Sequence, residues 1–315
     1  MPEQPDFETL VQLASDRSGG HQIKPVIRKE ILHYDILYAL DQRGLLDSLV
    51  FQGGTALRLC YGSQRLSEDL DFAGGRAFTA DDAHAIKQCV EHHIGKRYGL
   101  DVRVKEPKAL RVEGDRGAQG QNDVTVDKWQ ISVQTSPSRP DLPSQRIKLE
   151  IANVATYESA PCKLIANYDF LPNGYGDLLV PTESPTEIAT DKMVSLVNNE
   201  RYIRHRDIWD LEWLSHNHGE PDMALLRHKI DDYNVRDYAD KARAFARVLP
   251  AIVESTEFQN TMRRFVPAES AQRTLDKPKY REYLAQFVGR LLIEAADQLD
   301  LDHKPSADAG PDMGM

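Results

Sequence analysis

Apolar residues recur at three- and four-residue steps over residues 27–47 (IRKEILHYDILYALDQRGLLD), a spacing that predicts an amphipathic helix ending near Gly44. After this helix the segments with a regular apolar pattern become shorter. An apolar run over residues 49–51 stops at Gly53-Gly54, residues 55–61 have helical spacing, and residues 68–72 alternate like a half-buried strand. The predicted order is therefore strand, glycine turn, helix and strand.

The next part of the chain mixes one helix with further strands. Residues 79–97 have helical spacing, and the predicted strands cover residues 101–105, 123–134 and 146–154. Residues 113–122 are rich in glycine and are expected to form a mobile loop.

Helical patterns take over from Ser184. This serine is a favoured N-cap, proline follows at the first helical position, and Glu187 completes the start signal. The helical patterns continue through Leu301, with breaks expected at Gly219, Pro250 and Pro267.

These patterns divide the chain into an α/β (α+β) part followed by an all-helical part. A domain holds roughly 150 residues, so a chain of 315 is expected to form about two. We expect an α/β domain with an N-terminal helical lead-in over residues 1–183 and a helical domain over 184–302. Residues 303–315 lack apolar periodicity and are expected to be a disordered tail.

Composition narrows the class of protein. The formal net charge of −10 argues against a protein that coats nucleic acid nonspecifically, because such binding needs many Lys and Arg contacts to phosphate. A local basic surface is still compatible with the sequence, because basic residues cluster at residues 24–29, 201–206 and 277–281. The alternative for each cluster is a solvated helix face.

The sequence shows no sign of export, membrane insertion or a cysteine-based framework. No apolar run approaches the roughly 20 residues that cross a bilayer, and residues 1–10 lack the basic and apolar parts of a signal peptide. Cys60, Cys89 and Cys162 are widely spaced and form no CxxC pair, which predicts reduced thiols. We therefore expect a cytoplasmic protein with no membrane partner.

Asp69 and Asp71 are the strongest candidates for chemistry. Alternate residues of a strand share a face, so both carboxylates project together while Leu70 and Phe72 enter the core. The rise of a strand places them about 7 Å apart along the chain, within reach of one Mg²⁺ ion or a pair of ions. The alternative is a surface strand with two solvated acids.

Gly53 and Gly54 strengthen the metal hypothesis. Glycines between a strand and a helix let a phosphate approach backbone N–H groups at a helix N-terminus, although a plain tight turn would also use them. Ser67 can add a hydroxyl to the phosphate or cap the turn. Phosphate and metal side by side predict phosphoryl or nucleotidyl transfer.

Glu150 is the predicted third acid. Along residues 146–154 the apolar side chains alternate onto one face, which leaves Lys148 and Glu150 on the other. Glu150 can act as a metal ligand or as the general base for an attacking hydroxyl. A solvated Lys148/Glu150 face is the alternative.

Several of these residues together resemble a known family. Gly53-Gly54-Thr55-Ala56-Leu57 and Ser67-x-Asp69-Leu70-Asp71-Phe72 resemble the nucleotidyltransferase superfamily, and within it the AbiEii/AbiGii toxins of abortive-infection and type IV toxin–antitoxin systems. Asp191-Lys192-Met193 and Arg206-Asp207-Ile208-Trp209-Asp210-Leu211 extend the resemblance, which covers roughly residues 50–215.

The resemblance implies a fold, an activity and partners. The fold is a nucleotidyltransferase-like mixed sheet with flanking helices, followed by an all-helical C-terminal domain. The implied reaction transfers NMP from an NTP to an acceptor hydroxyl, most readily the tRNA 3′ end, with Mg²⁺ or Mn²⁺ as cofactor and a separately encoded antitoxin as partner. Together with the strand pattern, we expect Asp69, Asp71 and Glu150 to be metal ligands and Gly53, Gly54, Thr55, Ser67 and Lys192 to bind the nucleotide.

Asp207 can be examined by helical periodicity. A helix starting near Ile203 places Asp207 on one face with Leu211 and Leu214, and an unpaired carboxylate within such an apolar stripe is costly. Asp207 therefore needs a cationic partner, and Lys192 on the preceding helix is the candidate. By resemblance Lys192 helps to hold the triphosphate, and Asp207 orients that lysine or contributes to the wall of the active site. A structural ion pair between the two helices is the alternative. Asp210 lies at the edge of the stripe and is the weaker candidate.

Two further functions fit the same residues. The acceptor hydroxyl can belong to a protein or a small molecule, and the acidic net charge keeps this alternative open. A noncatalytic nucleotide sensor is the other alternative, although three carboxylates around a phosphate exceed what binding alone needs. Ribonuclease sensitivity of a labelled product separates an RNA acceptor from the others.

Overall fold

The computed structural model describes residues 5–18, 21–74, 80–107, 124–137, 139 and 141–302. The predicted loop at 113–122 and the predicted tail at 303–315 lie outside the described residues. No described helix is both long and apolar enough to cross a membrane.

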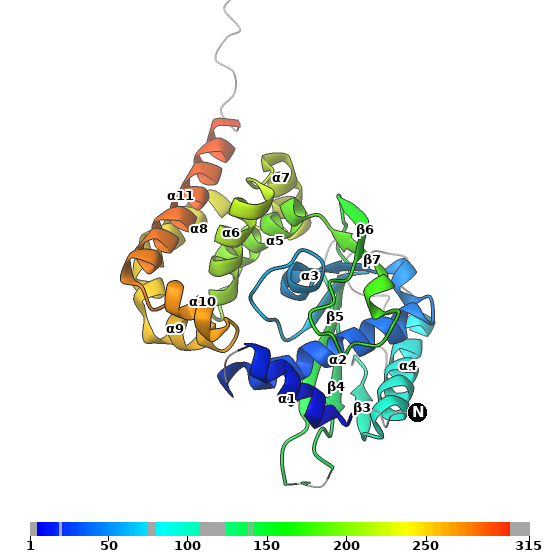
Figure 1. Ribbon diagram of the computed structural model, residues 1–315. Helices are drawn as coiled ribbons and strands as arrows, with labels where there is room; N and C mark the ends of the chain where they lie inside the picture. Colours follow the sequence, from blue (N-terminus) through cyan, green and yellow to red (C-terminus); the bar gives the residue numbers. More distant parts are fainter. Residues whose placement is uncertain are drawn as a thin grey trace, which may run out of the picture.

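The N-terminal half combines helices with a sheet (Figure 1). Its α-helices are α1 (Phe7–Ser18), α2 (Lys24–Asp41), α3 (Gly53–Leu59) and α4 (Ala80–Tyr98). Its strands are β1 (Val50–Gln52), β2 (Leu70–Ala73), β3 (Val102–Lys105), β4 (Val126–Val133), β5 (Gln145–Ala152), β6 (Ser159–Lys163) and β7 (Leu179–Glu183). The predicted order of strand, glycine turn, helix and strand is confirmed by β1, α3 and β2.

The strands form one mixed seven-stranded sheet in the order β3-β4-β5-β2-β1-β7-β6. β2 runs parallel to β5 and β1 runs parallel to β7, while the other neighbours are antiparallel. The short carboxylate-bearing strand β2 therefore lies in the interior of the sheet, with β1 on one side and β5 on the other. Hydrogen bonds to both neighbouring strands therefore hold the backbone of β2 in place.

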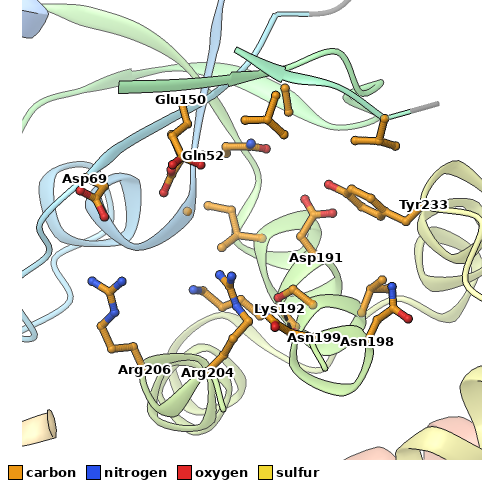
Figure 2. A pocket seen from close by; sticks show the side chains of 18 of the residues that line it. Gln52, Asp69, Glu150, Asp191, Lys192, Asn198, Asn199, Arg204, Arg206 and Tyr233 are labelled. Carbon is orange, nitrogen blue, oxygen red and sulfur yellow. Dashed lines mark hydrogen bonds between the residues drawn. The ribbon is translucent and has the colours of Figure 1, made fainter. Parts of the chain in front are cut away.

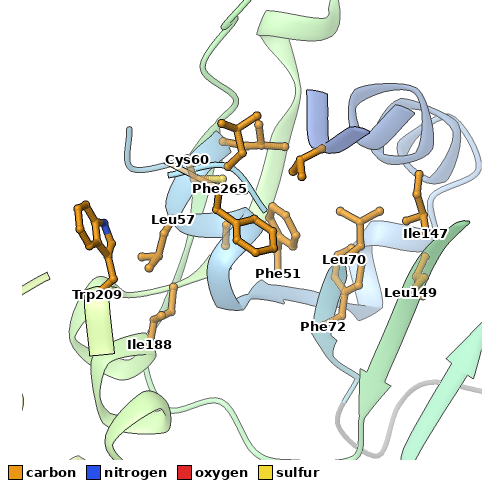
Figure 3. Close-up of a cluster of buried hydrophobic side chains, with 14 of the residues drawn as sticks. Phe51, Leu57, Cys60, Leu70, Phe72, Ile147, Leu149, Ile188, Trp209 and Phe265 are labelled. Atoms are coloured by element: carbon orange, nitrogen blue, oxygen red, sulfur yellow. The ribbon is translucent and has the colours of Figure 1, made fainter. Parts of the chain in front are cut away.

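One face of the central strands is packed into the core. Phe51 and Phe72 are register partners, both fully buried, with ring centroids 5.2 Å apart. Figure 3 shows these rings with Leu57 of α3 and with Trp209 from the helical half. The hydrophobic core therefore continues from the sheet into the helices, and the division into two domains stays a prediction.

The C-terminal half is helical, as predicted, and gathers on the opposite side of the molecule from α4 (Figure 1). Its helices are α5 (Pro185–Asn198), α6 (His205–His218), α7 (Met223–Asp232), α8 (Tyr238–Glu254), α9 (Thr256–Arg263), α10 (Ala268–Arg273) and α11 (Pro278–Asp302). The side chain of Ser184 accepts a hydrogen bond from the backbone N–H of Glu187, which confirms the predicted N-cap.

Two of the expected helix breaks are present and one is wrong. α6 ends at Gly219, whose φ of 94° suits glycine, and Pro267 precedes α10. Pro250, however, lies inside α8. Leu249 and Val253 on either side of it are fully buried. Their packing keeps the helix continuous despite the hydrogen bond that proline cannot donate.

Candidate active site

A cavity of about 760 Å³ lies between the open face of the sheet and helices α5 and α6 (Figure 2). Five predicted site residues line it, namely Gly53, Asp69, Asp71, Glu150 and Lys192. The remaining predicted site residues, Gly54, Thr55, Ser67 and Asp207, are not part of the lining. The structure thus brings together residues that are far apart in the sequence.

A row of polar side chains crosses four strands and forms the sheet wall of the cavity. Gln52 of β1 is the register partner of Asp71, Asp71 is the partner of Glu150 on β5, and Glu150 is the partner of Lys128 on β4. Register partners in a sheet point to the same face, so these side chains lie next to one another. The carboxylates of Asp71 and Glu150 are neighbours for this reason.

The acidic wall carries excess negative charge. Burial, followed by the charges of Asp69 and Glu150, raises the pKa of Asp71 to about 6. The Nζ atom of Lys128 lies 3.0 Å from Glu150, but its side chain is 59% exposed and screened by solvent. The Oε1 atom of Gln52 is buried and has no hydrogen-bond partner. An all-oxygen donor set with this charge fits Mg²⁺ or Mn²⁺.

The tightest acidic group lies elsewhere along the cavity. Among the described residues, the group of acids whose ligand atoms all lie within 4.8 Å of one another is Glu183, Glu187 and Asp191; Asp69, Asp71 and Glu150 are spaced more widely. The ammonium of the fully buried Lys229 lies 2.7 Å from Glu187, 3.1 Å from Asp191 and 3.8 Å from Glu183. Lys229 thus takes the place that a cation would need there.

The double glycine makes room for charged side chains. A Cβ atom built on Gly53 would lie 2.8 Å from the Oδ2 atom of Asp71, and Gly53 has a φ of +76°. A Cβ on Gly54 would lie 2.5 Å from the Nη2 atom of Arg65 and 3.0 Å from the Oγ atom of Ser67. A side chain at either position would therefore crowd these groups, a close approach that the sequence interpretation missed. Phosphate binding at this turn stays a prediction.

Thr55 and Ser67 lie behind the cavity wall. Thr55 is 1% exposed and its hydroxyl donates to the backbone carbonyl of Asp69, while Ser67 is 5% exposed. Thr55 therefore fixes the segment that carries the first carboxylate. Direct contacts of these two hydroxyls with a nucleotide stay a prediction.

Lys192 and its partners form the opposite wall. Its Nζ atom lies 2.9 Å from Asp207 and 2.7 Å from Asp210. The predicted pairing of Asp207 with Lys192 is thus confirmed, and Arg204 also donates to Asp207. Although burial acts in the other direction, Lys192 and Arg204 hold the pKa of Asp207 well below its usual range.

Asp210 has a larger part in the buried ion network than the helical periodicity indicated. It is fully buried, and Arg65 donates to its two oxygens at 2.7 and 2.6 Å. The predicted stripe is confirmed at Asp207, Leu211 and Leu214, which are buried, but Ile203 precedes α6 and is 41% exposed. The buried face of α6 is wide enough to include Asp210 as well. Asp210 therefore links Lys192 to Arg65, which fills the space beside Gly54.

Arg204 and Arg206 complete the basic wall, and neither was a predicted site residue, although Arg206 belongs to the motif at residues 206–211. Both point into the cavity toward the side of Asp69 and Glu150 (Figure 2). Arg206 lies over the ring of Phe265 at 4.9 Å and its Nη1 atom is 3.9 Å from Glu68. The basic segment at residues 201–206 was the available signal, and Arg204 and Arg206 within it line the cavity.

The fold is similar to that of a solved nucleotidyltransferase toxin. MenT4, a nucleotidyltransferase toxin from Mycobacterium tuberculosis H37Rv, matches with a TM-score of 0.52 and 18% identity over 92% of this chain and 98% of its own. JHP933 from Helicobacter pylori matches with a TM-score of 0.46 and 18% identity over 91% of this chain and 100% of its own. No curated protein sequence is significantly similar to the chain.

The sequence profile of one family covers most of the chain. The match runs over residues 35–298 and therefore includes both walls of the cavity. The chain belongs to the nucleotidyl transferase AbiEii toxin family of type IV toxin–antitoxin systems, and it is a nucleotidyltransferase.

Proposed function

We propose that this enzyme transfers a nucleotide from an NTP to the 3′ end of tRNA in the cytoplasm, and that a separately encoded antitoxin restrains it. The observation that carries the proposal is the charge arrangement of one cavity. Asp69, Asp71 and Glu150 lie on one wall, and Lys192 and two arginines lie on the other (Figure 2). A volume of about 760 Å³ is sufficient for a nucleotide-sized ligand.

The carboxylates of Asp69, Asp71 and Glu150 would hold Mg²⁺ or Mn²⁺. When bound, such an ion neutralises phosphate charge and activates the α-phosphorus for attack. Deprotonation of Asp71, whose pKa is raised to about 6, prepares this wall for a cation at neutral pH. Repulsion among the three acids then favours cation binding.

The basic wall binds and orients the triphosphate in this proposal. Lys192 has three N–H donors, and Asp207 and Asp210 accept from this ammonium within 2.9 Å, so a donor remains for phosphate. Arg204 and Arg206 add planar guanidinium groups, which pair well with phosphate oxygens. The buried aspartates thus position Lys192 without consuming all of its donors.

Glu150 has two proposed roles. As a metal ligand it completes the set with its neighbour Asp71. As a general base it accepts the proton of the attacking hydroxyl, for which its contact with Lys128 at 3.0 Å must open. The exposure of the Lys128 side chain makes this opening inexpensive.

The test is incubation of the purified protein with each α-labelled NTP, Mg²⁺ and total bacterial RNA. We expect label in RNA of tRNA size, removed by ribonuclease, and a loss of rate of roughly 10²-fold or more in Asp71→Asn. The matched control is Asp141→Asn, which removes an exposed carboxylate. No labelled product from folded protein, or label that resists ribonuclease and yields to protease, would contradict the tRNA proposal.

A second test addresses the toxin role. Induced expression in a bacterial host is expected to arrest growth, and Asp71→Asn is expected to abolish the arrest at equal protein level. Co-expression of the neighbouring reading frame is expected to restore growth. Growth arrest by the inactive variant would show that toxicity does not depend on nucleotidyl transfer.

A further inference from the structure

Cys60 and Cys162 lie together although 102 positions separate them in the chain. Cys60 follows helix α3, where Figure 3 shows it, and Cys162 belongs to strand β6. The backbone N–H of Ile165 donates to the carbonyl of Leu59 at 2.7 Å, which holds the two segments side by side. The Cys162 thiol contacts the carbonyl of Cys60 at 3.5 Å.

The two cysteine side chains are neighbours and differ in their surroundings. Cys60 is buried, with its sulfur 3.6 Å from the hydroxyl of Thr182, whereas Cys162 is partly exposed. The interaction with the neighbouring Cys60 side chain outweighs burial and lowers the pKa of Cys162 to about 7. Cys162 is therefore an accessible thiol that ionises near neutral pH, next to a buried thiol that can resolve it.

Cys89 provides an internal comparison. It is buried, its thiol donates to the carbonyl of Ile86 at 3.3 Å, and burial raises its pKa to about 11. A buried thiol with a raised pKa does not react first with an oxidant. The neighbouring Cys162 side chain, followed by burial, also raises the pKa of Cys60, so Cys60 can act only as the thiol that resolves an oxidised Cys162.

We propose that Cys60 and Cys162 form a peroxide-reactive dithiol site that closes reversibly to a disulfide. The Cys162 thiolate attacks one oxygen of hydrogen peroxide, the O–O bond breaks, and a sulfenic acid and hydroxide form. The Cys60 sulfur then attacks the Cys162 sulfur, the S–O bond breaks, and water leaves with the Cys60 proton. Two cysteine thiols are oxidised and one peroxide is reduced, and a dithiol reductant reverses the reaction.

The disulfide would connect helix α3 to strand β6. The other end of α3 begins at Gly53, which is in close contact with Asp71. The site therefore lies one short helix away from the acidic wall, and none of its thiols belongs to that wall. The proposal does not depend on the identity of the acceptor.

The experiment treats the full-length reduced protein with hydrogen peroxide, alkylates the remaining thiols and maps the peptides by mass. We expect an intramolecular Cys60–Cys162 peptide lighter by two hydrogens and restored by dithiothreitol, with Cys89 still reduced. In Cys60→Ser, dimedone is expected to trap a sulfenic acid on Cys162, and Cys162→Ser is expected to give neither product.

Three results would overturn the proposal. These are an unreacted Cys162 in the native wild type, a stable wild-type sulfenic acid with no disulfide, and a disulfide that forms only between molecules. The wild-type peptide map alone decides the first two, so the proposal remains testable if a serine variant does not fold. Nucleotidyl transfer is measured separately, and its failure would leave the thiol result unchanged.

Discussion

The substitution Asp210→Ala tests the buried ion network behind the basic wall. Asp210 is fully buried and accepts from Arg65 at 2.7 and 2.6 Å and from Lys192 at 2.7 Å. The side chains of Arg65 and Lys192 are 2% and 7% exposed. Removal of the carboxylate leaves Lys192 with Asp207 but leaves the guanidinium of Arg65 without its anionic partner.

The expected loss follows from this burial. Removing one partner of a buried ion pair lowers the free energy of unfolding by about 3–5 kcal/mol, since a charge remains in a site that water cannot reach. Against a total of roughly 5–15 kcal/mol this loss is large. It corresponds to a decrease in melting temperature on the order of 10 °C. Asp210→Asn keeps the shape and an acceptor oxygen, so its loss should be smaller.

The matched control is Asp141→Ala. Arg139 donates to both oxygens of Asp141 at 2.8 and 2.6 Å, nearly the same geometry as in the buried pair, but these side chains are 62% and 60% exposed. Urea unfolding and differential scanning calorimetry of both variants compare the loss of an Arg–Asp pair in a buried site with its loss in an exposed site. We expect almost no change for Asp141→Ala. Equal unfolding free energies for the two variants would refute the role of burial.

Further predictions concern the acidic wall. Burial and the neighbouring acids raise the pKa of Asp71 to about 6, so protons displace the cation below that pH. Mn²⁺ affinity measured from about pH 5 to about 8 should fall as the pH drops through that value. Glu150→Gln should move the midpoint of this fall to lower pH, because it removes one of the charges that raise the pKa of Asp71. Gly53→Ala, whose Cβ would lie 2.8 Å from Asp71 Oδ2, should weaken Mn²⁺ binding, whereas Gly174→Ala, with positive φ but no atom within 4 Å, should not. Lys128→Ala should leave the melting temperature unchanged because Lys128 is 59% exposed, yet it should strengthen Mn²⁺ binding by freeing Glu150; weaker binding would argue against Glu150 as a ligand.

Local patterns were sufficient for much of the fold and for part of the site. Alternation identified the strands of Asp71 and Glu150, and the N-cap at Ser184 marked the start of the helical half. The pairing of Lys192 with Asp207 followed from the cost of a buried unpaired carboxylate. Each of these inferences depends on residues within one element or on a strong local energetic penalty.

Long-range packing set the features that the sequence patterns missed. β7 contains Pro181 and its Leu179 is 58% exposed, so only its pairing with β1 and β6 makes it a strand. Arg65 attracted no attention because its partner Asp210 lies 145 positions away. The contact of Lys128 with Glu150 likewise depends on sheet register, which no single strand specifies.

The two walls of the cavity differ in how their charges are balanced, and this difference supports the proposed ligand, a cation bound to a triphosphate. The basic wall is internally paired, because Asp207 and Asp210 hold Lys192 and Arg204 in place. The acidic wall is held by backbone register, and burial, followed by the charges of the neighbouring acids, raises the pKa of Asp71. A free triphosphate would be repelled by that wall, and a free cation would leave the donors of the other wall unused. A cation bound to a triphosphate satisfies both walls at once, which is the form in which a nucleotidyltransferase receives its NTP.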